Sequence, residues 1–135
     1  MKLYKSILFL GLGGAGQRHL RYLHAAFPDA RLSCFRSKRT TPMLNSDFSV
    51  NPKNSLESDY GLKVFSSLRE ALENRPELVI ISTPSSFHAD QICQSLDAGC
   101  DVFCEKPGLI NLNEYQKLKY CMQRNDGGLY IGFQR

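Results

Sequence analysis

A glycine-rich turn near the start of the chain constrains the possible fold more than any other feature of the sequence. The stretch from Gly11 to Gly16 reads Gly-Leu-Gly-Gly-Ala-Gly and so has the spacing G-x-G-x-x-G. It follows the apolar run Ile7–Leu10 and precedes a helical pattern, which is the strand–turn–helix context that this motif requires. Gly11 permits a tight turn, Gly13 lets a ligand approach the backbone closely, and Gly16 lets the helix pack on the strand.

Strand-like and helix-like segments alternate along the whole chain, which favours a parallel sheet over an all-β or all-α fold. The pattern predicts an α/β fold, a Rossmann-type doubly wound parallel sheet of about six strands with helices on both faces. The predicted strands are Ser6–Leu10, Arg31–Phe35, Lys63–Phe65, Leu78–Ser82, Asp101–Cys104 and Leu129–Phe133.

Helices are predicted in the intervals between these strands. Their expected ranges are Ala15–Ala26, Ser67–Asn74, Phe87–Ala98 and Glu114–Arg124. Ser67 and Glu70 fit a capping box, and either Asn111 or Asn113 fits the cap of the last helix. The polar stretch 40–60 has little periodicity, so we expect a mobile loop with one helical turn there.

The length of 135 residues predicts one domain, spanning residues 1–135. No apolar run approaches the ~20 residues that cross a bilayer, which argues against a membrane protein. A formal charge of +4 is too small to indicate a nucleic-acid-binding protein. The first residues lead directly into a strand and leave no room for a signal peptide, so the cytoplasm is the expected location.

Five cysteines are scattered along the chain, an odd number with no C-x-x-C pair among them. They are Cys34, Cys93, Cys100, Cys104 and Cys121. We expect reduced thiols, because a cysteine in a strand-like run usually serves as a small buried apolar residue. The spacing of cysteines and histidines matches no zinc site, so no metal is predicted.

Arg36 lies about twenty residues after Gly16, where an NAD-binding domain usually carries an acid for the ribose 2′-hydroxyl. Ser37, Lys38 and Arg39 follow it. A guanidinium pairs with a 2′-phosphate, which a carboxylate would repel, so the stretch predicts NADP, with NAD as the alternative. The missing acid also counts against a methyltransferase. The alternative for the basic stretch is a solvated loop, with the adenosine end of the cofactor held by backbone and packing alone. The alternative for the glycine turn is a strand-to-helix turn that binds nothing.

Two later motifs extend the glycine turn into a family pattern. Residues 83–88 read T-P-x-x-x-H after the expected fourth strand, and residues 98–107 read A-G-x-x-V-x-x-E-K-P around the fifth. With the glycine turn and the following His19, the chain resembles the glucose-fructose oxidoreductase / inositol dehydrogenase (Gfo/Idh/MocA) family over essentially its whole length.

The resemblance implies a nicotinamide dinucleotide at the carboxyl edge of the sheet. Thr83 and Pro84 would line its ribose and pyrophosphate, and His88 would start the next helix beside them. Lys106 would be the catalytic residue, aimed at the nicotinamide and the reacting hydroxyl or carbonyl; the alternative is a surface lysine paired with Glu105. The candidate cofactor-binding residues are Gly11, Leu12, Gly13, Gly14, Ala15, Gly16, Arg36, Ser37, Arg39, Thr83, Pro84, His88, Glu105, Lys106 and Gln134.

Members of this family continue into a second α/β domain that covers the substrate site and mediates oligomer contacts. The resemblance therefore implies that this domain is absent from the chain, which alone is not expected to be catalytically competent. The expected function is the dinucleotide-binding domain of an oxidoreductase acting on a sugar, cyclitol or related polyol derivative. The alternatives are a non-catalytic dinucleotide sensor or interaction module, and a remnant that binds no cofactor.

Overall fold

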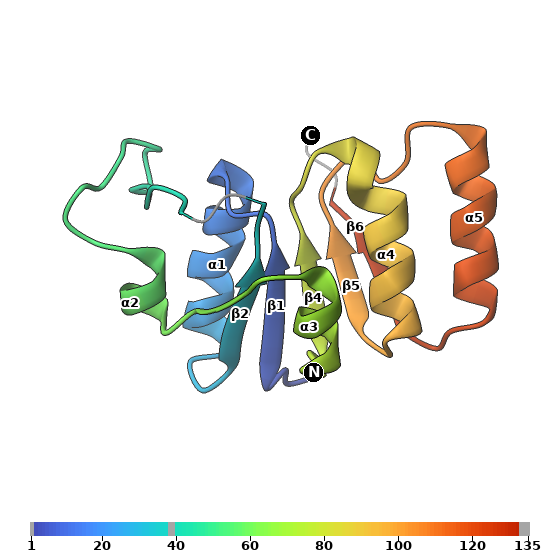
Figure 1. Ribbon diagram of the computed structural model, residues 1–135, viewed down its shortest axis with the longest axis horizontal. Coiled ribbons are helices and arrows are strands. Elements are labelled where there is room, and N and C mark those ends of the chain that lie inside the picture. Colours follow the sequence, from blue (N-terminus) through green and yellow to red (C-terminus); the bar gives the residue numbers. More distant parts are fainter. Residues whose placement is uncertain (1, 38–39, 133–135) are drawn as a thin grey trace.

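Six parallel strands form one sheet in the computed structural model, which describes residues 2–37 and 40–132 (Figure 1). The strands are β1 (Ser6–Leu10), β2 (Arg31–Phe35), β3 (Lys63–Phe65), β4 (Leu78–Ile81), β5 (Asp101–Cys104) and β6 (Leu129–Ile131). They follow the order β3-β2-β1-β4-β5-β6, in which two halves diverge from β1 and β4. The predicted Rossmann-type sheet is confirmed, with β4 one residue shorter than expected. The last strand ends at Ile131, and Phe133, where its end was expected, lies outside the described residues.

Helices cover both faces of the sheet. They are α1 (Gly14–Ala26), α2 (Leu56–Tyr60), α3 (Leu68–Glu73), the 3-10 turn η1 (Ser85–Phe87), α4 (His88–Asp97) and α5 (Leu112–Gln123). The helices α1 and α2 pack on one face, whereas α3 and α4 pack on the other and α5 lies against α4 (Figure 1). Among residues 2–37 and 40–132, none of these helices combines the length and apolar character that a membrane crossing requires.

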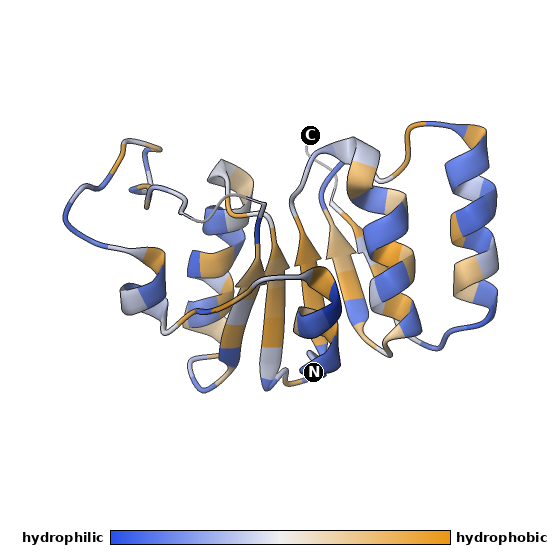
Figure 2. Ribbon diagram, in the orientation of Figure 1, coloured by the Kyte–Doolittle hydropathy of each residue, from blue (hydrophilic) through white to orange (hydrophobic). Residues whose placement is uncertain are grey.

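The core lies on both sides of the central strand β1. Ile7 and Phe9 point into the cluster beneath α1, and Leu8 and Leu10 point into the cluster beneath α4, because successive side chains of a strand face opposite sides. All four are fully buried. A strand buried on both faces needs a continuous apolar run, and Figure 2 shows this run as orange strands between helices with polar outer surfaces.

Side-chain caps fix where two helices begin. Ser67 Oγ accepts a hydrogen bond from the Glu70 amide at 3.1 Å, and Asn111 Oδ1 accepts one from the Glu114 amide at 2.9 Å. The predicted capping box is half formed, because the Glu70 carboxylate accepts from the Ser66 hydroxyl at 2.8 Å. Asn111 is thus the cap of α5, which begins two residues earlier than predicted.

The segment 40–55 is joined to the first helix by one buried side chain. Gln17 Nε2 donates to the carbonyl oxygens of Leu12 and Pro42, each at 2.9 Å. Its Oε1 accepts from the Leu44 amide at 2.7 Å. The sequence predicts a mobile loop with one helical turn over residues 40–60. The helical turn is present as α2, and the hydrogen bonds of Gln17 tie the preceding loop to the glycine turn.

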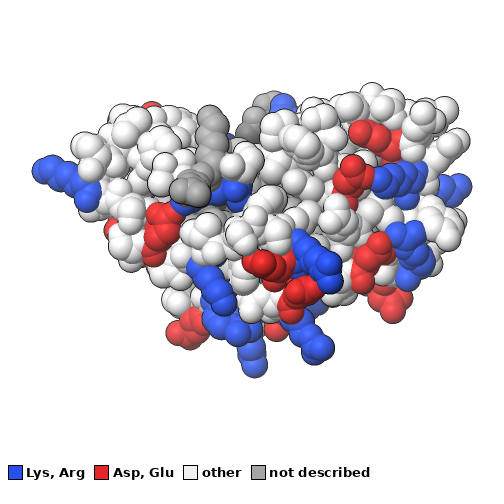
Figure 3. Space-filling model, viewed as in Figure 1, with Lys and Arg blue, Asp and Glu red and all other residues white. Residues whose placement is uncertain are grey.

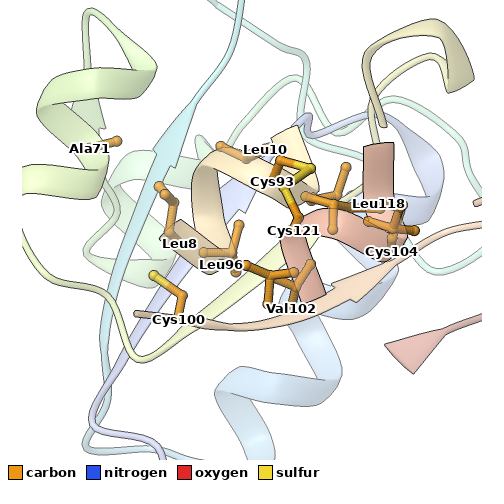
Figure 4. Close-up of a cluster of buried hydrophobic side chains, with 13 residues drawn as sticks. Leu8, Leu10, Ala71, Cys93, Leu96, Cys100, Val102, Cys104, Leu118 and Cys121 are labelled. Atoms are coloured by element: carbon orange, nitrogen blue, oxygen red, sulfur yellow. A yellow bond between two sulfur atoms is a disulfide. The ribbon is translucent and has the colours of Figure 1, made fainter. Parts of the chain in front are cut away.

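The cysteine prediction was wrong for one pair. Cys93 of α4 and Cys121 of α5 form a disulfide whose Cα atoms lie 5.7 Å apart, within the cluster drawn in Figure 4. The packing of α5 on α4 brings together two residues separated by 28 positions, which no local spacing indicates. Cys34, Cys100 and Cys104 are free and buried, as expected, and burial raises the pKa of the Cys104 thiol to about 12.

Candidate functional site

A cavity of about 570 Å³ opens beside the glycine turn at the carboxyl edge of the sheet. Ligands of open α/β sheets bind at this edge, where the strand order reverses, and here that point lies between β1 and β4. The walls come from the loops that follow β1, β2 and β4. The lining residues are Gly11, Leu12, Gly13, Phe35, Arg36, Ser37, Thr41, Ser82, Thr83, Pro84, Phe87 and Gln91.

Three glycines of the turn beside the cavity have different surroundings. Gly11 has a φ of +85°, and a Cβ there would lie 2.9 Å from the Ser82 carbonyl oxygen. A Cβ on Gly16 would lie 2.4 Å from the Gly11 carbonyl oxygen. A Cβ on Gly13 would meet no atom within 4 Å, so the backbone there faces open space. The tight turn at Gly11 and the close packing at Gly16 are confirmed, and Gly13 leaves room for a ligand.

Two features of the cavity fit a bound diphosphate ester. The helix α1 starts at Gly13 without a side-chain cap and has no acidic residue in its first turn, so its amide groups and the positive end of its dipole suit an anion. The Ser82 Oγ is buried and has no hydrogen-bond partner within residues 2–37 and 40–132. A hydroxyl or phosphate oxygen of a ligand would satisfy it.

Arg36 follows β2 and lines the cavity, with a side chain only 5% exposed. Its Nη2 donates to Glu57 Oε1, a carboxylate in the first turn of α2. Burial alone would raise the pKa of Glu57, but hydrogen bonding from its own backbone N–H and from Arg36 outweighs burial and holds that pKa below its ordinary value. A carboxylate from α2 thus pairs with the arginine that directly follows β2, although Glu57 itself does not line the cavity.

The loop after β4 is tied to the loop after β5 by His88. This ring is 1% exposed; its Nε2 lies 2.8 Å from the Thr83 carbonyl oxygen and its Nδ1 lies 2.7 Å from the Pro107 carbonyl oxygen. The Thr83 hydroxyl donates to Gln91 Oε1 at 2.5 Å. His88 does not line the cavity, and its contacts instead hold the two loops that flank it.

The Glu105-Lys106-Pro107 turn follows β5 at the same edge. Glu105 Oε1 lies 2.5 Å from His19 Nε2 and 3.5 Å from Arg18 Nη2, so its carboxylate joins this turn to α1. Lys106 is exposed, and the bond between Lys106 and Pro107 is cis. His19 is thus a hydrogen-bonded residue of α1 near the glycine turn.

The cavity brings together about half of the predicted cofactor residues. Those in its wall are Gly11, Leu12, Gly13, Arg36, Ser37, Thr83 and Pro84. Those outside the wall are Gly14, Ala15, Gly16, His88, Glu105 and Lys106. Arg39 and Gln134 lie outside the described residues.

Five residues of the cavity wall were not predicted from the sequence. They are Phe35, Thr41, Ser82, Phe87 and Gln91. Phe35 and Ser82 stand at the carboxyl ends of predicted strands, so their position at the sheet edge was a usable signal. The other three, Thr41, Phe87 and Gln91, line the cavity because the fold brings a loop and the start of a helix to it. No local sequence pattern indicates this.

Charge on the surface is mixed rather than gathered. Figure 3 shows Lys and Arg side chains interspersed with Asp and Glu on the face turned to the viewer. Within the described ranges, no three His, Cys, Asp or Glu side chains are grouped so that they could hold a metal ion.

Comparisons with known proteins agree with the geometry of this edge. Residues 5–133 match a family model described as "Oxidoreductase family, NAD-binding Rossmann fold" (GFO_IDH_MocA). The scyllo-inositol 2-dehydrogenase (NAD(+)) of Bacillus subtilis (strain 168) is 29% identical over an alignment of 133 positions, which covers 93% of this chain and 34% of that protein.

Two solved structures have the same fold. The WlbA dehydrogenase from Chromobacterium violaceum, in complex with NADH and UDP-GlcNAcA, superposes with a TM-score of 0.74 at 17% identity, over 98% of this chain and 36% of its own. Biliverdin reductase from Synechocystis sp. PCC 6803, in complex with biliverdin and NADP+, gives 0.73 at 18% identity, over 94% and 37%. The chain therefore spans about a third of the length of these proteins.

The family model leaves only the first four and last two residues unmatched. The glycine turn, the T-P-x-x-x-H motif and the E-K-P motif of this chain follow β1, β4 and β5 at one edge of the sheet. This chain belongs to the Gfo/Idh/MocA oxidoreductase family, in the region that forms its NAD-binding Rossmann fold.

Proposed function

We propose that the cavity beside the glycine turn binds a nicotinamide dinucleotide, a cofactor that supplies or accepts a hydride. The observation that carries this proposal is the open backbone at Gly13, which lines the cavity at the uncapped start of α1. The diphosphate would lie against these amides, where the helix dipole favours an anion. The buried Ser82 Oγ supports the same placement, because a bound ribose or phosphate would give it a partner.

We propose further that the cofactor is NADP(H). Arg36 stands in the cavity wall where the ribose of the adenosine half would lie, next to Ser37. A guanidinium and a hydroxyl there suit a 2′-phosphate, and the residue directly after β2 is not an acid.

In the complete protein, residues 1–135 would act as the dinucleotide-binding domain of an NADP-dependent dehydrogenase or reductase. The substrate class we propose is a sugar, cyclitol or related polyol derivative, because the curated relative named above acts on an inositol. Lys106 would be the catalytic residue: its ammonium group, at the same sheet edge as the cavity, can donate a hydrogen bond to the reacting oxygen and stabilise negative charge on it.

Calorimetric titration of the chain with NADPH and with NADH, at one stated salt concentration, tests the first two proposals. We expect saturable binding of both, with NADPH tighter. If neither dinucleotide binds, the proposed function is wrong. If NADH binds more tightly than NADPH, the dinucleotide site stands and the NADP preference is wrong.

We also propose a cytoplasmic location. Cys34, Cys100 and Cys104 are unpaired thiols, as is usual for cysteines in a reducing compartment, whereas the Cys93–Cys121 disulfide is unusual there. Cell fractionation followed by thiol counting in denaturant tests the location and the disulfide together. Recovery of the protein in the cytoplasmic fraction would support the location, and recovery in an oxidising compartment would contradict it. Three reactive thiols per chain would agree with the Cys93–Cys121 disulfide.

A further inference from the structure

Arg36, the cation expected to meet a 2′-phosphate, already holds a carboxylate. Its Nη2 donates to Glu57 Oε1, and the Arg36 side chain is 5% exposed while that of Glu57 is 39% exposed. The guanidinium lines the cavity, and Glu57 is not among the lining residues. The ion pair therefore joins a buried guanidinium in the cavity wall to a partly exposed carboxylate outside that wall.

The helix α2 fixes the Glu57 carboxylate in this position. The neighbouring Leu56 is 1% exposed and belongs to the core cluster beneath α1. Ser55 caps the helix, its Oγ accepting from the Ser58 amide at 3.2 Å. An anchored residue on one side and a capped turn around it keep the carboxylate next to Arg36 without any ligand.

NADPH and NADH would present different groups to the Arg36–Glu57 ion pair. NADPH brings a 2′-phosphate, an anion that needs the donors of Arg36 and is repelled by an adjacent carboxylate. NADH brings a hydroxyl, which leaves the pair intact and can itself donate to a carboxylate. Binding of NADPH must therefore exchange one anion on Arg36 for another, whereas binding of NADH need not.

We propose that Glu57 is a specificity-determining residue that competes with the 2′-phosphate for Arg36 and so limits the preference for NADPH. This inference rests on the proposed function, since it concerns the same site and the same cofactor. It places the discriminating acid on α2, twenty-one positions after Arg36 in the sequence, rather than at the end of β2.

The test compares NADPH and NADH affinities of four forms of the chain by calorimetric titration at one ionic strength: the unchanged chain, Glu57→Gln, Arg36→Ala and the double variant. Glu57→Gln should tighten NADPH binding by about tenfold and leave NADH binding within about twofold. Arg36→Ala should weaken NADPH binding by about 10- to 150-fold. In the Arg36→Ala background, Glu57→Gln should give little further gain.

Asp59→Asn is the matched control, because Asp59 is an exposed carboxylate on the same short helix and its removal changes the net charge equally. This control should leave both affinities unchanged. Thermal unfolding of each variant identifies any that fails to fold. If Glu57→Gln fails to fold, Glu57→Asp replaces it, and we expect a smaller gain in NADPH affinity.

The outcomes separate this inference from the function on which it rests. Absence of binding by the unchanged chain would overturn both. Binding of both dinucleotides with an unchanged NADPH-to-NADH ratio in Glu57→Gln would overturn only the role of Glu57. A gain for NADPH that persists in full without Arg36, or that Asp59→Asn reproduces, would show general charge repulsion and overturn the competition for Arg36.

Discussion

His88 Nδ1 lies 2.7 Å from the carbonyl oxygen of Pro107, nineteen residues later in the chain. The opposite ring nitrogen lies 2.8 Å from the carbonyl oxygen of Thr83. Thr83 lines the candidate cofactor cavity, and Pro107 directly follows Lys106. One buried ring therefore contacts both the loop after β4, which lines the cavity, and the loop after β5, which carries the proposed catalytic lysine. In this geometry His88 is a positioning residue that holds the two loops together.

Replacing His88 with Ala should lower the free energy of unfolding by about 2 to 4 kcal/mol, because it leaves a cavity and removes the buried ring that contacts two backbone carbonyl oxygens. Urea denaturation measures this difference. His24→Ala is the control, since His24 is a partly exposed ring on α1 with an edge contact to Tyr60, and it should cost less than about 1 kcal/mol. Equal losses in the two variants would contradict the positioning role.

The glycines of the turn should separate binding from folding. Gly13→Ala should leave the free energy of unfolding unchanged within about 0.5 kcal/mol, because its Cβ meets no neighbour, yet weaken dinucleotide binding by tenfold or more. Gly16→Ala should destabilise the chain by about 1 to 3 kcal/mol, because its Cβ would lie 2.4 Å from the Gly11 carbonyl oxygen. Urea denaturation and calorimetric titration of both variants check this contrast. Unimpaired binding by Gly13→Ala would move the diphosphate away from this turn.

The sheet and the glycine turn were predictable because each depends on residues that are close together in the sequence. The run Leu78–Ile81 is a continuous apolar stretch, as a strand buried on both faces must be, and the three glycines of the turn act within six residues. Helix starts were less certain, because Asn111 and Asn113 are equally good caps by residue type. Only the structure shows that Asn111 reaches the Glu114 amide.

The partners of long side chains could not be predicted, because they depend on which elements the fold places side by side. Arg36 meets Glu57 and His19 meets Glu105 across 21 and 86 positions, and no spacing in the sequence indicates either pair. The missing acid after β2 was a true observation about the sequence. It does not describe the surroundings of Arg36, where α2 supplies a carboxylate outside the cavity wall.

Asp101 should make stability depend on pH. It accepts hydrogen bonds from Lys2 Nζ at 2.7 Å, the Tyr4 hydroxyl at 2.8 Å and the Gly128 amide at 2.8 Å. Burial alone would raise the pKa of Asp101, but these donors and the Lys2 charge outweigh it and hold the pKa below the ordinary 3.8. A lowered folded-state pKa stabilises the protein above the unfolded pKa, and the stabilisation is lost as the pH falls through the folded pKa.

Asp101→Asn should therefore cost about 1 to 2 kcal/mol of unfolding free energy at pH 7 and progressively less below pH 3.8. Urea denaturation at several pH values between 7 and about 2 gives the difference directly. The exposed Asp29, replaced by Asn, serves as the control and should show no such trend. A cost for Asp101→Asn that is the same at every pH would mean that the lost side-chain shape matters and the charge does not.

Lys106 should separate an oxidoreductase from a module that only binds the dinucleotide. The residue is exposed and lies outside the cavity wall, so Lys106→Ala should leave the NADPH affinity of this chain within about twofold. Lys119→Ala, a second exposed lysine on α5, is the control for the loss of one positive charge. A large loss of affinity in Lys106→Ala alone would mean that Lys106 binds another part of the cofactor than the nicotinamide end proposed here.

In the complete protein, Lys106→Ala should lower kcat about 100-fold or more with little change in the cofactor KM, because the ammonium group would stabilise charge that develops only during reaction. A complete protein whose turnover is unaffected would remove the catalytic assignment and leave the binding module as the better account of this domain.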